Sequence, residues 1–429
     1  MLMLLLIIFS KIVSCSDETS SPICGLTKLS GAPRQLKPNR VYDACVIGAG
    51  VFGSWTAYEL RRAGKQVILV DAYGAGNSRS SSGDESRIIR MGYGADEIYT
   101  RSALHSLKRW NEFFADVNER LFHQTGVLWL AHEDDSYPLK TGETFARVGI
   151  PFERLTTDEL ARRYPQIGLE NIAWAILEPA AGILSARRAV QAVVGAGISD
   201  GIEFLRDAVV ASSVAHTAHG PDARTTLNQI STVSGRHISA ATFVFACGPW
   251  LPKLFPELLA DRIQPTRQEV FYFGAPSGDL RFTSPALPTW IDFKDEAYGL
   301  PDLEGRGVKV AIDRHGLLFD PDSGDRVVTS AGLAEARRCL ARRLPAMKDA
   351  PVIEARVCQY ENTSNGDFLI DRHPDFENVW LVGGGSGHGF KHGPAVGEYL
   401  AARIEGGESV SERRFSLASK ATLYNRSVF

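Results

Sequence analysis

An apolar run that stops at glycines is the first clear pattern along the chain. Residues 44–47 (ACVI) are continuously apolar, and the glycine-rich segment 48–53 (GAGVFG) follows directly. Residues 54–62 are amphipathic, and a second apolar run, residues 67–70, ends at Asp71. This order predicts a strand, a glycine turn, a helix, a second strand and an acidic residue at the end of that strand.

The rest of the chain mixes helical and strand patterns. Helices are expected over residues 98–114, 157–164, 186–195 and 332–343, with a last helix ending near residue 403. Strands are expected over residues 126–131, 203–205, 209–214, 242–246, 268–273, 288–293, 308–312 and 379–382. A Gly- and Ser-rich loop is expected over residues 74–86, and a second glycine-rich turn over residues 383–389. The patterns indicate an α/β protein without an internal repeat.

Composition excludes several classes of protein. The 429 residues are 44% hydrophobic and 23% charged, which suits a globular chain with one or two large cores and excludes a disordered chain. The net charge of −3, without a basic block, argues against nucleic-acid binding. The six cysteines are too few for a disulfide framework, and without CxxC or CxxH spacing no metal site is expected.

The first fourteen residues are the candidate membrane segment. Residues 2–9 are continuously apolar, about half the length that a bilayer span needs. They fit the core of a signal peptide, and residues 12–15 (IVSC) resemble a bacterial lipobox with Cys15 as the acylated residue. No Lys or Arg precedes the run, so an upstream start codon or a disordered extension is the alternative. Residues 1–40 are therefore expected to be a signal-like segment and tether, and the localisation stays open between the cytoplasm and export or lipid anchoring.

The first glycine turn has the spacing of a dinucleotide-binding motif. Gly48 permits a tight turn, Gly50 lets a diphosphate approach the backbone, and Gly53 lets helix and strand pack closely. The following helix offers free N–H groups and a positive dipole end to phosphates. Asp71 is expected to accept hydrogen bonds from the adenosine ribose. The motif alone leaves NAD and FAD open.

The second glycine turn favours FAD. A nicotinamide enzyme would continue as one contiguous doubly wound sheet, whereas here a Ser/Gly loop follows the first unit. The second strand-to-helix glycine turn comes more than 300 residues later. This spacing predicts one long cofactor held by both ends of the chain, with a second domain inserted between them.

Four further motifs resemble those of a known family. They are residues 86–90 (SRIIR), 307–309 (GVK), 357–360 (VCQY) and 386–391 (SGHGFK). They resemble the D-amino-acid-oxidase-like flavoproteins, and more narrowly the family of monomeric sarcosine oxidase, N-methyltryptophan oxidase, pipecolate oxidase and fructosyl-amino-acid oxidases. The resemblance runs from about residue 42 to about residue 405.

The resemblance implies an α/β (α+β) fold, a Rossmann-like FAD-binding domain with an inserted mixed-sheet substrate domain. The FAD-binding domain is expected over residues 41–120, 180–250 and 355–429, and the substrate-binding domain over residues 121–179 and 251–354. The cofactor-binding residues are expected to be Gly48, Gly50, Val51, Phe52, Gly53, Asp71, Ser86, Arg87, Val209, Cys358, Gly385, Gly387, Gly389 and Lys391.

Cys358 matches the family cysteine that bonds to the flavin 8α-methyl group through sulfur. A thiolate is a good nucleophile when nearby cations lower its pKa. The resemblance therefore implies covalent FAD. A buried structural cysteine is the alternative.

The other matched positions imply roles in the reaction. In the family, the arginine equivalent to Arg87 lies close to the flavin, and the residues equivalent to Arg90 and Lys391 bind the substrate carboxylate. The residue equivalent to Lys309 lies near the flavin, where it assists oxygen. Tyr298 and His388 match residues that face the substrate side of the flavin.

Two positions depart from the family pattern. Asp313 stands where sarcosine oxidase has a pocket histidine, and the loop 81–85 lacks the histidine found in close relatives. An added carboxylate would change the charge of the pocket and favour a substrate with a second cation. Sarcosine itself is therefore not the expected substrate by default.

The leading hypothesis is an FAD-dependent oxidase that acts on secondary amines of N-substituted or cyclic amino acids. The products are an imine and H2O2, with O2 and a small amino acid as the partners of a monomeric enzyme. The first alternative is a flavin dehydrogenase that passes electrons to a quinone or carrier. The second is a non-catalytic, tethered binding protein on the same scaffold.

Overall fold

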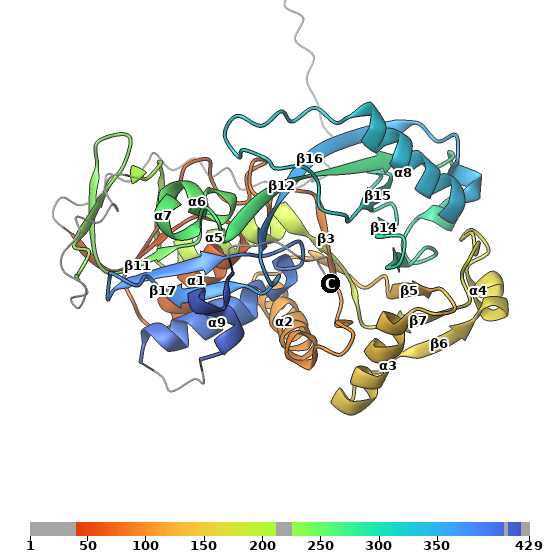
Figure 1. The fold of residues 1–429 in the computed structure, drawn as a ribbon, viewed down its shortest axis with the longest axis horizontal. Coiled ribbons are helices and arrows are strands. Elements are labelled where there is room, and N and C mark those ends of the chain that lie inside the picture. The colour runs from red at the N-terminus through yellow and green to blue at the C-terminus, as the bar shows by residue number, and fades with distance from the viewer. Residues whose placement is uncertain (1–39, 212–224, 407–410, 422–429) are drawn as a thin grey trace, which may run out of the picture. The chain divides into compact units, whose positions relative to one another are not determined.

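The first glycine turn lies at the carboxyl end of β1, a central strand of a mostly parallel sheet (Figure 1). This computed structural model describes residues 40–211, 225–406 and 411–421. The sheet has the order β17-β18-β11-β1-β2-β9, with β10 paired to β11. Its strands are β1 (Val41–Ile47), β2 (Val67–Asp71), β9 (Glu203–Arg206), β10 (Gln229–Ser231), β11 (His237–Phe245), β17 (Leu369–Arg372) and β18 (Val379–Gly383).

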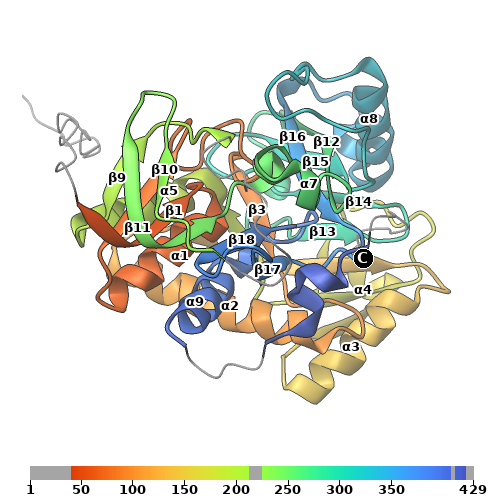
Figure 2. The ribbon, with the colours of Figure 1, turned by 60° about the vertical axis from the view of Figure 1, so that its left-hand side comes forward.

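Helices from both ends of the chain pack beside this sheet. They are α1 (Val51–Arg62), α2 (Glu97–Asp116), α5 (Ala186–Ser199) and α9 (Gly393–Ile404). Helix α9, drawn in blue, lies against α1, drawn in red-orange, in Figures 1 and 2. Trp55 of α1 and Trp110 of α2 meet edge to face, with ring centroids 4.9 Å apart. Segments from both ends of the described chain therefore share one hydrophobic core.

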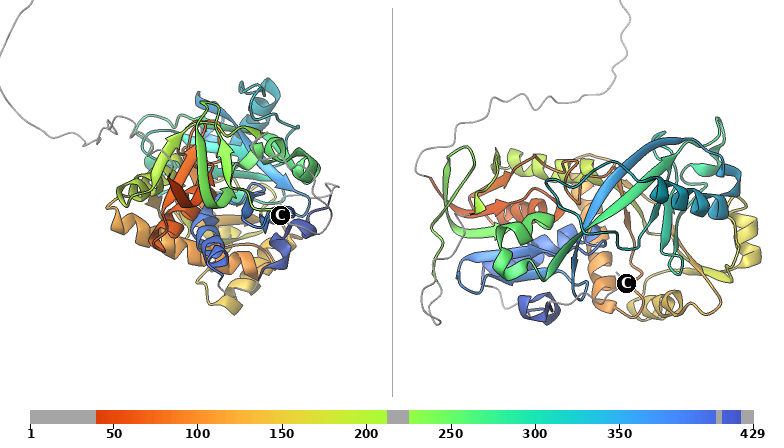
Figure 3. Two further views of the ribbon diagram at one scale, coloured as in Figure 1. Left: turned by 90° about the vertical axis from the view of Figure 1, so that its left-hand side faces the viewer. Right: turned by 45° about the horizontal axis from the view of Figure 1, so that its top comes forward.

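The second sheet is mixed and has the order β16-β12-β15-β14-β13-β5-β7-β6. Its strands are β5 (Val127–Ala131), β6 (Glu153–Thr156), β7 (Trp174–Glu178), β12 (Ile263–Phe273), β13 (Thr289–Asp292), β14 (Ala297–Leu300), β15 (Val308–Ile312) and β16 (Val352–Thr363). Helix α8 (Ser330–Arg343) packs on β12 and β15, while α3 (Ser136–Val148) packs on β5 and β7 (Figure 3). Helix α4 (Thr157–Arg163) follows β6. The mixed sheet confirms the expected fold class.

Two strands carry site residues from this sheet toward the first one. β12 and β16 form a long antiparallel pair from Ile263 opposite Thr363 to Phe273 opposite Val352. A small third sheet has the order β3-β8-β4. It consists of β3 (Ser86–Ile89), β4 (Phe122–His123) and β8 (Gly182–Ser185), and short helices α6 (Leu251–Leu254) and α7 (Pro256–Leu259) follow β11.

Most expected elements form, but one expected strand does not, and several observed elements were not expected. The expected strand over residues 209–214 is wrong in its described part, because only Val209 pairs, in an isolated bridge with Thr232. The cause is local: β9 is the edge of its sheet, and Asp207 turns the chain away by accepting hydrogen bonds from Ala208 N and Ser234 Oγ. Helix α3 and strands β3, β4, β6, β7, β8, β10, β14, β16 and β17 were not expected. Apart from β16, these strands have five residues or fewer, which is too short to show a clear apolar period.

Other expectations are not decided by the fold. Residues 41–429 cluster as one unit, so the division into discontinuous domains stays a prediction. The expected leader and tether, residues 1–40, lie outside the described residues except for Arg40. Among the described helices, none combines the length and the apolar character that a membrane crossing requires.

Candidate active site

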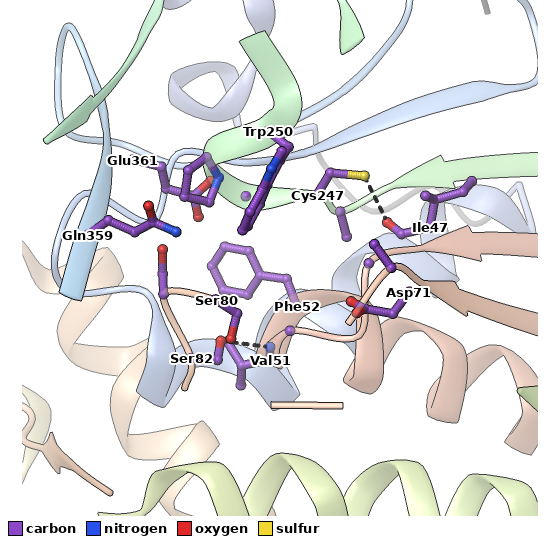
Figure 4. A pocket seen from close by; sticks show the side chains of 18 of the residues that line it. Ile47, Val51, Phe52, Asp71, Ser80, Ser82, Cys247, Trp250, Gln359 and Glu361 are labelled. Atoms are coloured by element: carbon purple, nitrogen blue, oxygen red, sulfur yellow. Dashed lines mark hydrogen bonds between the residues drawn. The ribbon is translucent and has the colours of Figure 1, made fainter. Parts of the chain in front are cut away.

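A first cavity of about 300 Å³ opens where β1 ends in the glycine turn. Its lining includes most of the residues expected to bind a dinucleotide, namely Gly48, Gly50, Val51, Phe52, Asp71, Arg87, Val209, Gly385, Gly387 and Gly389. In Figure 4, Asp71 lies on one side of this cavity and Glu361 lies on the other, with Phe52 and Trp250 between them. Two glycine turns that are distant in sequence thus face one cavity, as a long cofactor requires.

Two glycines of the turn are needed for close packing. Gly48 has φ of +105°, and a Cβ there would lie 2.2 Å from the Ala246 carbonyl oxygen. A Cβ on Gly53 would lie 1.9 Å from the Gly48 oxygen, so Gly53 acts behind the cavity rather than in its lining. The roles expected for these positions, a tight turn and close helix packing, agree with this geometry.

The Asp71 carboxylate fixes the backbone of the same turn through hydrogen bonds. One carboxylate oxygen accepts from Ala49 N at 2.7 Å, and the other accepts from Tyr73 N at 2.8 Å and Gly74 N at 2.7 Å. Burial raises the pKa of Asp71, and these backbone donors partly offset that effect. Because Asp71 also lines the cavity, a carboxylate lone pair remains for a ribose hydroxyl.

The cavity has unmatched polar groups of the kind that a dinucleotide satisfies. Glu361 is buried, its Oε2 has no hydrogen-bond partner among the described residues, and burial raises its pKa to about 7. The start of α1 brings Val51 N to the cavity, where Ser82 Oγ accepts from it at 3.0 Å (Figure 4). Backbone amides, a helix N-terminus and buried acceptors fit the diphosphate and hydroxyl groups of FAD.

A second cavity of about 580 Å³ meets the first. Arg87, Tyr360, Gly387 and Phe390 line both cavities. The second cavity collects the remaining expected residues, namely Ser86, Arg90, Tyr298, Lys309, Cys358, His388 and Lys391. The arrangement therefore brings the expected catalytic and substrate-binding residues together around one continuous space.

An aromatic wall forms one side of the second cavity. Tyr137 stacks on Phe293 with ring centroids 4.0 Å apart, and it also contacts Trp129. The guanidinium of Arg90 lies 4.8 Å from the Trp129 ring centroid and 4.7 Å from that of Tyr93. These rings hold the arginine by cation–π contacts and leave an apolar surface for a substrate side chain.

Arg90 and Lys391 place two buried positive charges in this cavity. Burial opposes the charge on Arg90, but Tyr137, Tyr93 and Glu178 outweigh it and raise the pKa of Arg90. Burial, together with repulsion from Arg90, lowers the pKa of Lys391 well below its ordinary value. The Lys391 ammonium donates to Tyr93 OH at 2.8 Å and to the His388 carbonyl at 2.9 Å.

Lys309 is held in a buried ionic network. Its ammonium contacts Asp84, which also accepts from Arg87 at 2.6 Å and from the Tyr272 hydroxyl at 2.9 Å. Burial opposes ionisation of Asp84, but Lys309 and Arg87 outweigh it and lower the pKa of Asp84. Burial lowers the pKa of Lys309, and Asp84 limits that fall. The Asp84 carboxylate therefore holds the Lys309 ammonium beside Arg87 and Cys358 and favours its charged form.

Cys358, on β16, lines the second cavity next to these cations. Burial and the charge of Asp84 raise its pKa, although Arg87 and Lys309 act in the opposite direction. The two cations act on the thiol pKa in the expected direction, but burial is the larger effect and the net shift is upward.

Tyr298 and His388 differ in their freedom. Tyr298 lies in the second cavity, where burial and the charge of Asp313 raise its pKa. His388 is fixed by Tyr93 OH at 3.1 Å from Nδ1 and by the Gly366 carbonyl at 3.0 Å from Nε2. This geometry favours a positioning role for His388, and its direct action on a substrate stays a prediction.

Several residues of the site were not expected from the sequence. Asp84, Tyr272, Trp129 and Glu178 lack a distinctive local motif, since each acts through a partner far along the chain. Glu178 accepts from Met91 N at 2.8 Å and from Trp129 Nε1 at 2.6 Å, which fixes the segment after Arg90. Glu361 had no local signal either, because β16 itself was not expected; in that strand it lies on the face opposite Cys358.

Comparison with known proteins agrees with this geometry. Residues 43–403 match the FAD dependent oxidoreductase family named DAO. Peroxisomal sarcosine oxidase of Homo sapiens is 30% identical over 368 residues, covering 84% of this chain and 91% of its own. Monomeric sarcosine oxidase of Bacillus sp. (strain B-0618) is 30% identical over 371 residues with the same coverage. The solved L-proline dehydrogenase from P. horikoshii aligns with a TM-score of 0.75 at 21% identity, over 88% of this chain and 97% of its own.

Proposed function

The chain belongs to the DAO family of FAD dependent oxidoreductases, and from that premise we propose that it oxidises the secondary amine of an N-substituted or cyclic amino acid with O2. Two relatives that are 30% identical to this chain are named sarcosine oxidases, and these names support the proposed class of substrate. The proposal also follows from charges in the second cavity and from the shape of its walls.

The observation that carries the proposal is the pair of buried cations, Arg90 and Lys391. Both residues are at most 5% exposed, and the repulsion between their charges contributes to the lowered pKa of Lys391. A substrate carboxylate between them would relieve this repulsion and receive the planar hydrogen bonds that arginine makes. The cavity therefore favours a small carboxylic acid over a simple amine.

FAD would be held by the two glycine turns, Asp71, Val209, Arg87 and Cys358, and it supplies the two-electron oxidation of the C–N bond. Overall, the amine and O2 give an imine and H2O2, and water then converts the imine into a carbonyl compound and an amine. The protein's own contribution is to bind the carboxylate, orient the α-carbon and exclude water. The apolar wall that excludes water is formed by Trp129, Tyr137 and Phe293.

Lys309 supports O2 as the electron acceptor. A fixed ammonium in a dry site stabilises negative charge that develops on oxygen. Asp84 keeps that ammonium in place and charged. A quinone or carrier protein as acceptor is the alternative outcome of the test below.

Covalent attachment of FAD through Cys358 is part of the proposal. The sulfur lies among Arg87, Lys309 and the second cavity, so a flavin in that cavity would lie close to it. The positive charges of Arg87 and Lys309 favour the thiolate that must form for a carbon–sulfur bond. We also propose that the enzyme is a monomer, which light scattering of the purified protein tests directly.

The experiment is a screen for substrates of the purified yellow protein. H2O2 release is measured with sarcosine, N-methyl amino acids, pipecolate, proline and fructosyl amino acids, each compared with a primary amine that lacks a carboxylate. Stoichiometric H2O2 and O2 uptake are expected for an oxidase. Bleaching under nitrogen without H2O2 in air would indicate a dehydrogenase, and no bleaching by any compound would indicate a binding protein.

A further inference from the structure

Asp313 is a carboxylate inside the second cavity that the proposed reaction has not yet used. It follows β15 directly, four residues after Lys309. Its Oδ1 accepts a hydrogen bond from the Tyr360 hydroxyl at 2.5 Å. Within the described residues, its Oδ2 has no hydrogen-bond donor, and the carboxylate has no ion pair within 4.0 Å. One acceptor atom is therefore available to a ligand.

Charged and titratable groups surround Asp313 from several elements. Tyr360 faces it from β16, and Tyr298 from β14. Arg90 and Lys391 lower its pKa from across the cavity, while Glu296 raises it. Burial is the largest effect, so the pKa of Asp313 is raised overall.

The two cations do not use Asp313 as their partner. The Lys391 ammonium donates to Tyr93 and to the His388 carbonyl, and Arg90 donates to the Gly92 carbonyl. Asp313 is close enough to both to influence their charge, yet it is not in contact with either. A carboxylate held at a short distance from a carboxylate-binding pair has the layout that a zwitterion needs, since an α-amino acid carries both charges on adjacent groups.

We propose that Asp313 binds the substrate's α-ammonium group and accepts its proton, while Arg90 and Lys391 hold the substrate carboxylate. This assignment rests on the proposed function. The N–H bond breaks, an O–H bond forms on Asp313, and no electrons are exchanged. The nitrogen becomes the neutral amine that oxidation requires, and Tyr360 fixes the accepting carboxylate in place.

Binding the zwitterion has a clear chemical advantage. An amine whose pKa is near 10 is neutral in only about one molecule in a thousand at pH 7. An enzyme that selects the neutral amine from solution therefore uses a scarce species. A carboxylate of raised pKa is a better proton acceptor than an exposed one, which makes Asp313 suited to take the proton inside the cavity.

The first test measures binding, using the absorbance change of the bound flavin under nitrogen. Sarcosine is compared with butanoate, and L-pipecolate with cyclohexanecarboxylate, because each pair has a similar shape and differs in the nitrogen. The wild-type protein should prefer the zwitterion, and Asp313→Asn should reduce that preference roughly 10- to 100-fold. Asp313→Glu should recover part of it. An unchanged preference in Asp313→Asn overturns the assignment.

The second test measures how kcat/KM depends on pH for the best substrate of the screen. Wild-type activity should rise with pH and reach a plateau once Asp313 is ionised. Asp313→Asn should instead rise about tenfold per pH unit toward the pKa of the amine, so the two profiles converge near pH 10. Parallel profiles would show a merely structural residue and overturn the assignment.

A third comparison separates the α-ammonium from a second cation. Nα-methyl-lysine and Nα-methyl-norleucine share the α-amine and differ in the side-chain charge. Asp313→Asn should weaken both equally. A loss confined to Nα-methyl-lysine would assign Asp313 to the side chain and overturn this proposal, and a failure of every compound to bind or bleach the flavin would refute the proposed function itself.

Discussion

Replacing Asp84 by asparagine tests whether the network around Lys309 is a structural necessity. Asp84 and Lys309 have side chains that are 0% and 2% exposed, and Arg87 shares the same carboxylate. Asp84→Asn keeps the size of the side chain and a partner for Tyr272, but it leaves two neighbouring cations without a countercharge. Removing one partner of a buried ion pair costs about 3–5 kcal/mol, so we expect a loss of that size in the free energy of unfolding.

The matched variants decide whether charge is the cause. Lys309→Met leaves Asp84 paired with Arg87 at 2.6 Å, so the expected loss is smaller, about 1–3 kcal/mol. The double variant removes the stranded ammonium together with the carboxylate, and should be more stable than Asp84→Asn alone. Glu304→Gln is the surface control, because its pair with Arg188 is 53% and 46% exposed and should contribute about 0–1 kcal/mol.

The assay is urea unfolding of the flavin-loaded proteins, followed by circular dichroism, with the slope of the transition compared across variants. A similar slope with a lower midpoint is the expected result for Asp84→Asn. A loss below about 1 kcal/mol would refute the reasoning. The reasoning would also be refuted if the double variant lost more free energy of unfolding than the two single variants lose together, because the two groups would then not compensate each other's charge.

Four further outcomes follow from the site. FAD should stay with the acid-precipitated protein and add its mass to the Cys358 peptide, whereas free flavin in the supernatant would contradict a covalent link. Arg90→Met should lower kcat/KM for carboxylate substrates by roughly 30- to 150-fold, from about 2–3 kcal/mol of lost hydrogen bonding, while an equal loss in the exposed control Arg188→Met would contradict this role. Lys309→Met should slow O2 uptake roughly 10²- to 10³-fold and leave anaerobic bleaching nearly unchanged, and an equal effect on both would assign the lysine elsewhere. Burial raises the pKa of Glu361 from 4.5 to about 7. The free energy of unfolding of the flavin-free protein should therefore decrease as the pH rises from 4.5 to 7, and Glu361→Gln should lack this decrease. Identical pH profiles for the two proteins would contradict this role of Glu361.

Local patterns in the sequence were sufficient for the parts of the site that form between neighbours in the chain. Gly48, Gly53 and Asp71 belong to one strand–turn–helix–strand unit, so spacing alone placed them together. Matched motifs located Arg90 and Lys391, which the fold brings into one cavity. The tether at the N-terminus and the domain boundaries had no comparable geometric test.

The rest depended on contacts between distant residues. Lys309 and Asp84 are 225 positions apart, and no local pattern announces that they form an ion pair. Strand β16 has polar residues on both faces because one face meets each cavity, and this removes the alternation by which a strand is recognised. The sign of the Cys358 pKa shift also depends on burial, which spacing does not reveal.

The packing of α9 against α1 has a consequence for how the protein is made. Strand β1 is made first, its neighbour β11 is about 200 residues behind it, and β18 and α9 follow later still. Closing such long loops is slow, so the nascent chain exposes an unpaired β1 edge until β11 has been made. A messenger truncated before residue 379 would yield a chain without β18, the second glycine turn and α9. Cofactor loading therefore has to wait until β18, the second glycine turn and α9 have been made.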